Sequence, residues 1–374
     1  MTTPRHWILP LLALLLAAPA HAQFAPGGPD DPDTPIDAAT RAAVVESLAV
    51  QVQRHYIFAD KGAELARALR KRAAGKQYDR ITSSKELADT LTAHMQATTH
   101  DLHMRVHYRH EPLPVLKPHE PSADEIRMQT DFERLRNFGF ESVQRLPGNV
   151  GLLDLRSFSS LPEAHERATV AMSFLGNCDA LIVDLRRNGG GDPAMIATLL
   201  SYLVAPGDRL LFNTFEQRGE TTLRQFYTSP FVPGPRLNGK PVYVLTSPFT
   251  GSAAEEFSYD IQTHQLGRTV GGTTAGAANP GEMHRLSEHM AAFIADGRAV
   301  NPITKTNWEG VGVKPDVAVP PHTALREALV LAIQDLLQKP RSDEHKAFLQ
   351  RALNAAKQRA DDPASDYERP RRRS

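Results

Sequence analysis

The stretch VYVLTSPFTGSAAEEF, residues 242–257, carries the sequence signals of a strand, a loop and a helix in direct succession. Its first five residues are mostly apolar, which is typical of a strand buried on both faces. Pro248 and Gly251 predict the loop, and Ala254 and Phe257 fall on one face of the helix that follows. A buried strand that leads through a short loop into a helix is the repeating unit of α/β folds.

The same succession occurs earlier in the chain. Apolar strands are predicted at 150–155 and 180–185, and helical patterns follow them at 161–175 and 193–204. Strands that are apolar throughout need cover on both faces, so the alternation indicates the α/β fold class with a buried sheet. We expect this core to occupy residues 104–338.

A small helical domain is predicted in front of the core, at residues 37–103. Val44 and Leu48 belong to a series of apolar residues at helical spacing within it. Residues 23–36 are rich in proline, glycine and aspartate, which predicts a linker. The core would then begin with a short strand at 104–108.

The first 22 residues have the pattern of an export signal. Arg5 precedes a short apolar run, and Ala20-His21-Ala22 is a small-x-small cleavage site. The run is too short to span a membrane comfortably, although a retained membrane anchor is the alternative interpretation. We therefore assign residues 1–22 to a signal peptide and expect an exported protein, periplasmic or secreted, without stable membrane insertion.

Composition excludes several classes of protein. The 43 basic and 43 acidic side chains balance, so bulk charge does not attract nucleic acid or an anionic membrane. Cys178 is the single cysteine and excludes an internal disulfide. Residues 339–374 predict a C-terminal helix followed by a basic, disordered tail. Nothing in the composition predicts an oligomeric state.

Ser252 is the candidate nucleophile. A serine at the start of a helix faces unpaired backbone N–H groups and the positive end of the helix dipole. Negative charge that develops on an attacked carbonyl oxygen is stabilised at such a position. Gly251 and Ala253 keep the approach to the hydroxyl open. The alternative is that Ser252 or Thr250 simply caps the helix.

The stretch LIVDLRRNGGG, residues 181–191, places three glycines directly after a buried strand. A glycine turn lets a substrate approach the backbone closely and presents free N–H groups, which is half of an oxyanion hole. It lacks both the G-x-G-x-x-G pattern and the Lys-Ser/Thr of a phosphate-binding loop, so nucleotide binding is not expected. A plain strand-to-helix turn is the alternative.

A serine nucleophile needs a base, usually a histidine held by a carboxylate. His103 lies where the helical domain leads into the core, a place from which a side chain can overhang a cleft. Glu309 is a candidate carboxylate in a predicted loop, with a surface position as the alternative. The histidines near His103 also suggest zinc, but no fixed ligand pattern such as H-E-x-x-H occurs, so no metal or other cofactor is expected.

Four motifs in this order resemble the tail-specific (C-terminal processing) peptidase family. They are the glycine turn, the nucleophile segment at 250–257, the glycine-rich stretch at 271–276 and the closing GVGVKPD at 310–316. The likeness covers roughly residues 37–335. It implies a crotonase-like (ClpP-like) β-α superhelix, with the helical domain covering the cleft.

The better-known branch of that family uses a Ser-Lys dyad and carries a PDZ domain. Here Ala277 stands at the lysine position, and the stretch between His103 and Asn149 has too little strand pattern for a PDZ domain. The chain is more similar to the branch of interphotoreceptor retinoid-binding protein and the tricorn protease core. That branch pairs its serine with a histidine and a glutamate at positions that match His103 and Glu309.

The resemblance therefore implies a Ser252 nucleophile, a His103 base and a Glu309 that orients the base directly or through an intervening group. It also implies that the N–H groups of Gly190 and Ala253 form the oxyanion hole. The expected activity is hydrolysis of peptide bonds in peptides or proteins through an acyl-enzyme. A non-catalytic binder of peptides or apolar ligands, an acyl-CoA enzyme on the same fold, and an esterase are the alternatives.

Overall fold

A computed structural model describes residues 31–113 and 122–367 of the chain. The predicted signal peptide at 1–22, most of the linker at 23–36 and the arginine-rich end of the tail lie outside these residues. Within the described residues, no helix combines the length and the apolar character needed to cross a membrane.

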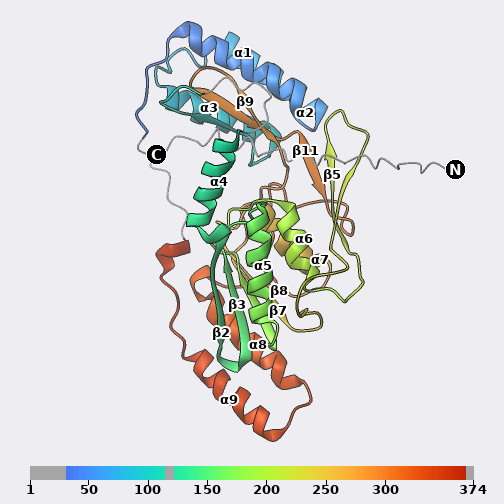
Figure 1. Ribbon diagram of the computed structural model, residues 1–374. Coiled ribbons are helices and arrows are strands. Elements are labelled where there is room, and N and C mark those ends of the chain that lie inside the picture. The colour runs from blue at the N-terminus through green and yellow to red at the C-terminus, as the bar shows by residue number, and fades with distance from the viewer. Residues whose placement is uncertain (1–30, 114–121, 368–374) are drawn as a thin grey trace, which may run out of the picture.

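The N-terminal lobe consists of three helices and a three-stranded antiparallel sheet, at the top of Figure 1. Side-chain caps fix where two of its helices begin: Asp37 accepts the Thr40 N–H at 2.6 Å, and Ser83 accepts the Glu86 N–H at 3.0 Å. The elements are α1 (Ala38–His55), α2 (Ala59–Ala74), α3 (Ser84–Thr99), β1 (Arg105–Tyr108), β9 (Glu282–Arg285) and β10 (Met290–Ile294), in the sheet order β1-β10-β9.

The strand predicted at 104–108 forms, but it does not begin the core. β1 pairs with β10, where Val106 lies opposite Ala292, and it packs against Leu48 and Leu91 of the helices in one hydrophobic cluster. β1 therefore packs with the N-terminal lobe, whereas the sequence analysis assigned it to the core. Its pairing partner lies far later in the chain, where local periodicity gives no signal.

The predicted α/β core contains a six-stranded sheet in the order β12-β8-β7-β4-β3-β2. Only the pairing of β2 with β3 is antiparallel among these neighbours. The strands are β2 (Phe140–Leu146), β3 (Val150–Leu155), β4 (Ala180–Asp184), β7 (Val242–Thr246), β8 (Arg268–Gly271) and β12 (Val317–Ala318).

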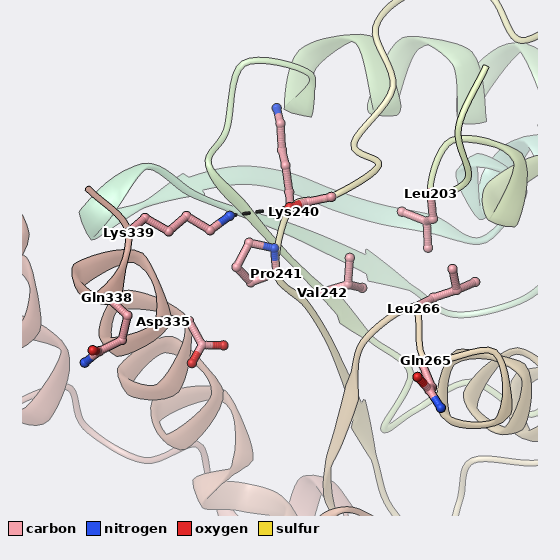
Figure 2. A pocket seen from close by; sticks show the side chains of 10 residues that line it. Leu203, Lys240, Pro241, Val242, Gln265, Leu266, Asp335, Gln338 and Lys339 are labelled. Atoms are coloured by element: carbon pink, nitrogen blue, oxygen red, sulfur yellow. Dashed lines mark hydrogen bonds between the residues drawn. The ribbon is translucent and has the colours of Figure 1, made fainter. Parts of the chain in front are cut away.

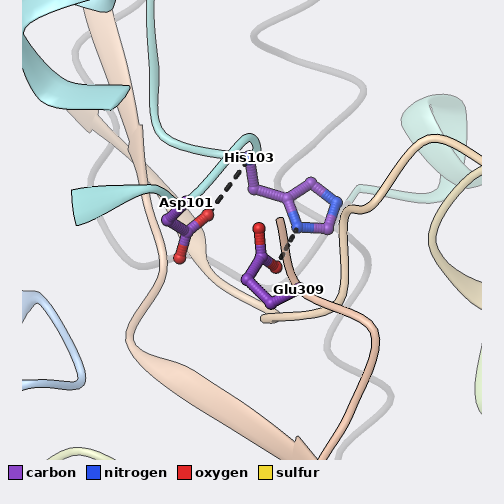
Figure 3. A group of neighbouring side chains, drawn as sticks. All are labelled: Asp101, His103 and Glu309. Carbon is purple, nitrogen blue, oxygen red and sulfur yellow. Dashed lines mark hydrogen bonds and ion pairs between the residues drawn. The ribbon is translucent and has the colours of Figure 1, made fainter. Parts of the chain in front are cut away.

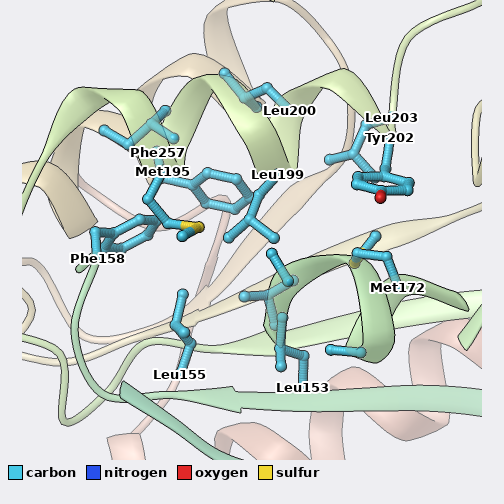
Figure 4. Packing of buried hydrophobic residues seen from close by; sticks show 14 of the residues in the cluster. Leu153, Leu155, Phe158, Met172, Met195, Leu199, Leu200, Tyr202, Leu203 and Phe257 are labelled. Atoms are coloured by element: carbon cyan, nitrogen blue, oxygen red, sulfur yellow. The ribbon is translucent and has the colours of Figure 1, made fainter. Parts of the chain in front are cut away.

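Alternate residues of the central strands face two different helix layers, as the two-residue period of a strand requires. On one face, Val183 and Val244 pack beneath helices α5 (Pro162–Leu175), α6 (Pro193–Ser201) and α7 (Ala253–Thr263). Figure 4 shows part of this layer, with Leu153 and Leu155 below the helical side chains. On the other face, Ile182 and Leu245 pack against α8 (Ala324–Gln338) and α9 (Asp343–Lys357).

The ribbon beside the core is a second three-stranded sheet, in the order β11-β5-β6. Its strands are β5 (Leu211–Gln217), β6 (Arg224–Tyr227) and β11 (Gly297–Val300). Arg218, which follows β5, donates to the carbonyl oxygens of Gln53, Arg54 and Tyr56 and so joins the ribbon to the end of α1. Helix α4 (Ala123–Leu135) runs between the N-terminal lobe and the core (Figure 1).

Four short 3-10 helices complete the described chain: Asn137–Gly139, Pro147–Asn149, Pro321–Thr323 and Ala364–Tyr367. The last of these lies beyond the C-terminal helix, and the basic end of the predicted tail, after Tyr367, falls outside the described residues. Tyr367, the last residue of this 3-10 helix, is 6% exposed and stacks on Arg186 of the core. A contact between residues so distant in sequence has no local signal.

Candidate active site

Ser252 lies between β7 and α7 in a backbone conformation that side chains rarely adopt. Its φ is 51° and its ψ is −123°. A residue that only caps a helix normally has β-region angles, with negative φ. A serine held at positive φ on a sharp strand-to-helix turn is instead the geometry of a nucleophile elbow. The backbone therefore favours the nucleophile interpretation over the simple cap.

The loop before Ser252 is fastened to the loop that follows β4. These two strands are parallel neighbours, so their carboxyl ends meet at the same edge of the sheet, where α/β proteins place their sites. Three hydrogen bonds join the loops: Ser247 Oγ donates to Arg186 O (2.5 Å), Thr250 Oγ1 to Leu185 O (2.8 Å) and the Gly251 N–H to Asn188 O (3.1 Å).

The glycine turn touches Ser252 directly. A Cβ atom on Gly190 would lie 2.7 Å from Ser252 Cβ and 2.9 Å from Gly251 O, and the φ of Gly190 is +118°. Only glycine fits at this close approach. In this conformation the Gly190 N–H donates to the buried Asn188 Oδ1 at 2.8 Å. Ala253 begins α7, where the N–H has no partner within the helix.

Glu255 is a site residue that the sequence reasoning missed. It is fully buried, and its carboxylate accepts four hydrogen bonds. The donors are the Ser252 N–H (2.9 Å), Thr274 Oγ1 (2.5 Å), the Gly276 N–H (2.6 Å) and the Ala277 N–H (2.9 Å). Burial raises the pKa of Glu255, and these bonds act in the opposite direction. The spacing S-x-x-E, typical of a capping box, was the available signal.

His103 and Glu309, predicted to act together, lie side by side (Figure 3). His103 Nδ1 is 3.9 Å from Glu309 Oε2, and both side chains are mostly buried. In Figure 3 the other ring nitrogen, Nε2, faces away from Glu309. Glu309 is itself held by backbone donors: Leu102 to Oε1 at 2.9 Å, and Ala278 and Asn279 to Oε2 at 2.6 and 2.9 Å.

Asp101, also missed by the sequence reasoning, lies behind this pair. It is fully buried and accepts hydrogen bonds from Asn279 Nδ2 (3.0 Å) and from the backbone N–H of His103 (3.1 Å). Burial raises the pKa of Asp101. The pKa of Glu309 is raised to about 7, mainly by burial and secondly by the negative charge of Asp101. The carboxyl that faces His103 therefore titrates close to neutral pH.

One short segment, residues 274–279, connects the two halves of the site. Its first part donates to Glu255, which holds the Ser252 backbone. Its last part donates to Glu309, which faces His103. The structure thus places Gly190 against Ser252, and His103 beside Glu309. The backbone of residues 274–279 connects the first pair, through Glu255, to the second pair.

Asp101, His103 and Glu309 each offer one possible metal-ligand atom, and these atoms lie within 4.8 Å of one another. However, both oxygens of Glu309 already accept backbone N–H groups, and Asp101 accepts an amide and a backbone N–H. Donors of this kind stabilise a carboxylate without a cation. The arrangement suits an anion that supports a histidine better than it suits a metal ligand set.

A cavity of about 550 Å³, whose lining residues are drawn in Figure 2, lies at the opposite end of β7 from Ser252. Its lining includes Val242, the first residue of β7, whereas Ser252 follows the last one. Of its two lysines, Lys240 donates from Nζ to Gly176 O and Cys178 O, and Lys339 donates to Gly239 O at 3.4 Å. The cavity is therefore separate from the candidate active site.

Comparison with protein families identifies the class of protein. The model of peptidase family S41 matches residues 149–319, and the model of the N-terminal domain of that peptidase in eukaryotic IRBP matches residues 38–136. The matched residues include Ser252, Glu309 and His103. The chain belongs to peptidase family S41 and is a serine-type peptidase.

Solved structures with the same fold are distant in sequence. A candidate peptidase from Parabacteroides merdae has a TM-score of 0.54 and 19% identity, over 80% of this chain and 97% of that one. Mature CPAF has a TM-score of 0.53 and 11% identity, over 86% of this chain and 97% of that one. The tricorn protease has a TM-score of 0.51 and 12% identity, over 83% of this chain and 37% of that one.

Proposed function

We propose that this peptidase is an exported endopeptidase that cleaves peptide bonds through Ser252, His103 and Glu309. The observation that carries the proposal is the segment 274–279, whose backbone holds both the nucleophile's helix and the carboxylate beside His103. An arrangement in which one backbone stretch fixes both groups keeps their relative positions constant. Peptides or proteins are the substrates that membership of a peptidase family implies.

In the proposed reaction, His103 Nε2 takes the proton of Ser252 Oγ as that oxygen attacks the peptide carbonyl carbon. The C–N bond breaks, and His103 returns the proton to the leaving amine. Water then attacks the acyl-enzyme with His103 again as base, which releases the acid and restores the serine. Glu309 supports the imidazolium that forms in each half of the reaction.

The distance of 3.9 Å between His103 Nδ1 and Glu309 Oε2 is longer than a hydrogen bond. Catalytic hydrogen bonds are often long in an enzyme without substrate and shorten in the Michaelis complex. Because Glu309 is fixed by three backbone donors, we infer that the His103 ring is the part that moves.

For the oxyanion hole we propose the N–H groups of Ala253 and Gly190. The Ala253 N–H lies at the positive end of α7, which suits a developing negative charge. The Gly190 N–H must share or exchange its hydrogen bond to Asn188 Oδ1 when substrate binds. Loss of one such donor typically raises the barrier by about 3 to 4 kcal/mol.

Peptide hydrolysis by purified protein tests this proposal. With quenched fluorescent peptides, we expect wild-type activity and a fall of about 10⁴-fold or more in Ser252→Ala and in His103→Ala. Intact-mass analysis of the products separates an endopeptidase, which cuts internal bonds, from an enzyme that trims ends. Cleavage of simple esters but of no peptide would favour the esterase, and peptide binding without turnover would favour the binder.

Export is a separate part of the proposal, supported by the pattern of residues 1–22. In a bacterial host, the full chain should accumulate in the periplasm or the medium with a new N-terminus at Gln23. A chain that starts at Gln23 should stay in the cytoplasm. Full-length protein that keeps its first 22 residues and stays in the cell would contradict this part alone.

A further inference from the structure

The C-terminal segment 358–367 leaves α9 and returns to the carboxyl edge of the central sheet. Two of its residues, Asp362 and Tyr367, contact Arg186, which lies in the loop between β4 and the glycine turn. The family match ends at residue 319, so this segment lies beyond the region that defines the peptidase. Its attachment next to the candidate active site lies outside the residues that the family model matches.

Arg186 is a buried cation, 1% exposed, that needs more partners than the core supplies. Asp184 accepts from its Nε and Nη2 at 2.9 and 2.6 Å, and Pro321 O accepts from Nη1 at 2.7 Å. The C-terminal segment adds the remaining ones: Asp362 Oδ2 lies 2.9 Å from Nη1, and the Tyr367 ring centroid lies 4.2 Å from Cζ. Because a buried charge is costly without full pairing, these contacts fix the guanidinium in one position.

The backbone of Arg186 acts on the other side, toward the nucleophile. Its carbonyl oxygen accepts Ser247 Oγ at 2.5 Å, which fastens the loop that leads to Ser252. Four residues later, Gly190 lies in contact distance of Ser252. A displacement of Arg186 would therefore move both loops that shape the candidate oxyanion hole.

The segment is also anchored along its length. Asp361 pairs with Arg326 of α8 at 3.1 Å, and the Asp362 N–H donates to His322 O at 3.0 Å. Tyr367 Oη donates to Asp362 Oδ2 at 3.0 Å, so the two groups that contact Arg186 hold each other. These bonds give the segment a defined path from α9 to Arg186.

We propose that residues 358–367 form a C-terminal strap that positions the glycine turn against Ser252. Asp362 and Tyr367 are then positioning residues for the peptidase reaction, although neither touches the substrate. The inference rests on the proposed role of Ser252. Its specific consequence is that loosening the strap lowers the reactivity of Ser252 in protein that is still folded.

The test compares three tyrosine variants by the rate at which a fluorophosphonate modifies Ser252, and by kcat and KM for a peptide. Tyr367→Ala removes the ring from Arg186, whereas Tyr367→Phe keeps the ring and loses only the hydroxyl. Tyr78→Ala is the matched control, because Tyr78 is 3% exposed but belongs to the N-terminal lobe. All rates are measured well below each variant's unfolding midpoint, so that loss of stability does not change the readout.

We expect Tyr367→Ala to lower the modification rate and kcat about tenfold to a hundredfold with little change in KM, because a displaced turn misplaces the reacting groups. Tyr367→Phe should stay near wild type, and Tyr78→Ala should lose stability but keep its modification rate. A wild-type rate in folded Tyr367→Ala would overturn the strap. If that variant does not fold, Asp362→Asn gives the same readout with a smaller change.

The proposed function fails in a different way in the same experiment. If the wild-type enzyme is not modified at Ser252, the nucleophile assignment is refuted, and the strap with it. If wild type is modified at Ser252 and folded Tyr367→Ala, or Asp362→Asn where that variant does not fold, reacts at the wild-type rate, only the strap is refuted.

Discussion

Ala277 and Ala278, neighbours in the chain, donate their backbone N–H groups to two different carboxylates. Ala277 donates to Glu255 at 2.9 Å, and Ala278 donates to Glu309 at 2.6 Å. Glu255 also accepts the Ser252 N–H, and Glu309 faces His103. Two consecutive residues therefore bind the carboxylate that holds the nucleophile and the carboxylate beside the candidate base. Ala277 therefore contributes to the site through its backbone N–H.

Activity should rise with pH through about 7. Burial, and next the charge of Asp101, raise the pKa of Glu309 to about 7, so the carboxylate that supports His103 is lost as pH falls below that value. Asp101→Asn removes one negative neighbour and should move the rising limb of kcat/KM toward lower pH by about one unit. If the rising limb of the kcat/KM profile stays in place or moves to higher pH in Asp101→Asn, the assignment of that limb to Glu309 is contradicted.

The same pKa shift has a consequence for stability, with a defined sign. The folded pKa of Glu309 is raised above its ordinary value of 4.5, so the unfolded chain ionises this carboxyl first. Between about pH 4.5 and 7 the folded state binds more protons, and the contribution of Glu309 to the free energy of unfolding falls as pH rises. Glu309→Gln should flatten that part of the curve in urea titrations across this range.

Glu255→Gln should reduce activity because it disturbs the elbow rather than substrate binding. An amide offers one acceptor oxygen where four donors now share two, so at least one buried donor loses its partner. We expect kcat to fall about tenfold to a hundredfold with KM nearly constant.

Glu256→Gln is the matched control for that variant. Burial raises the pKa of Glu256 to about 7, and its Oε1 accepts Asn213 Nδ2, a bond that a glutamine oxygen can keep. Steady-state kinetics on both variants gives the comparison. Equal losses of kcat in the two would show that Glu255 has no special connection to Ser252.

Gly190→Ala should abolish most of the activity, whereas Gly189→Ala should be tolerated. At Gly190 a Cβ would lie 2.7 Å from Ser252 Cβ at a φ of +118°, while at Gly189 a Cβ would have no atom within 4 Å. Displacement of the elbow by about 1 Å is enough for a loss of about 100-fold. Peptide hydrolysis and far-UV circular dichroism on both variants test this, and an active Gly190→Ala enzyme would show that the contact is unimportant.

Chelators should leave activity unchanged. The carboxylates of Asp101 and Glu309 direct their oxygens at N–H donors, an arrangement that does not need a cation. Peptide hydrolysis after incubation with EDTA or 1,10-phenanthroline, followed by dialysis, is the measurement. Loss of activity that zinc restores would revive the metal hypothesis for the His103 region.

Local patterns were sufficient for the elements around Ser252. A five-residue apolar strand, a Pro/Gly loop and a helical stripe are encoded within 242–257, and β7, the turn and α7 form there. The glycines at 189–191 likewise lie in the loop after β4, as the apolar run before them predicts. Such signals work because each element is specified by neighbours in the sequence.

What the sequence did not reveal are contacts between distant segments. Asp101 meets Asn279, β1 pairs with β10, and Arg186 meets Tyr367, each across more than 170 residues. A buried aspartate and an exposed one look the same in a single sequence. The pairing of carboxylates with backbone N–H groups at 274–279 also depends on loop conformation, which composition does not encode.

The most direct test of the account is to identify the residue that a fluorophosphonate modifies, by peptide mapping of wild type, Ser252→Ala and His103→Ala. We predict that the wild-type enzyme carries the adduct on Ser252, that Ser252→Ala carries none and that His103→Ala reacts at least about 100-fold more slowly. An adduct on another residue, or a wild-type rate in His103→Ala, would contradict the assignment of nucleophile and base.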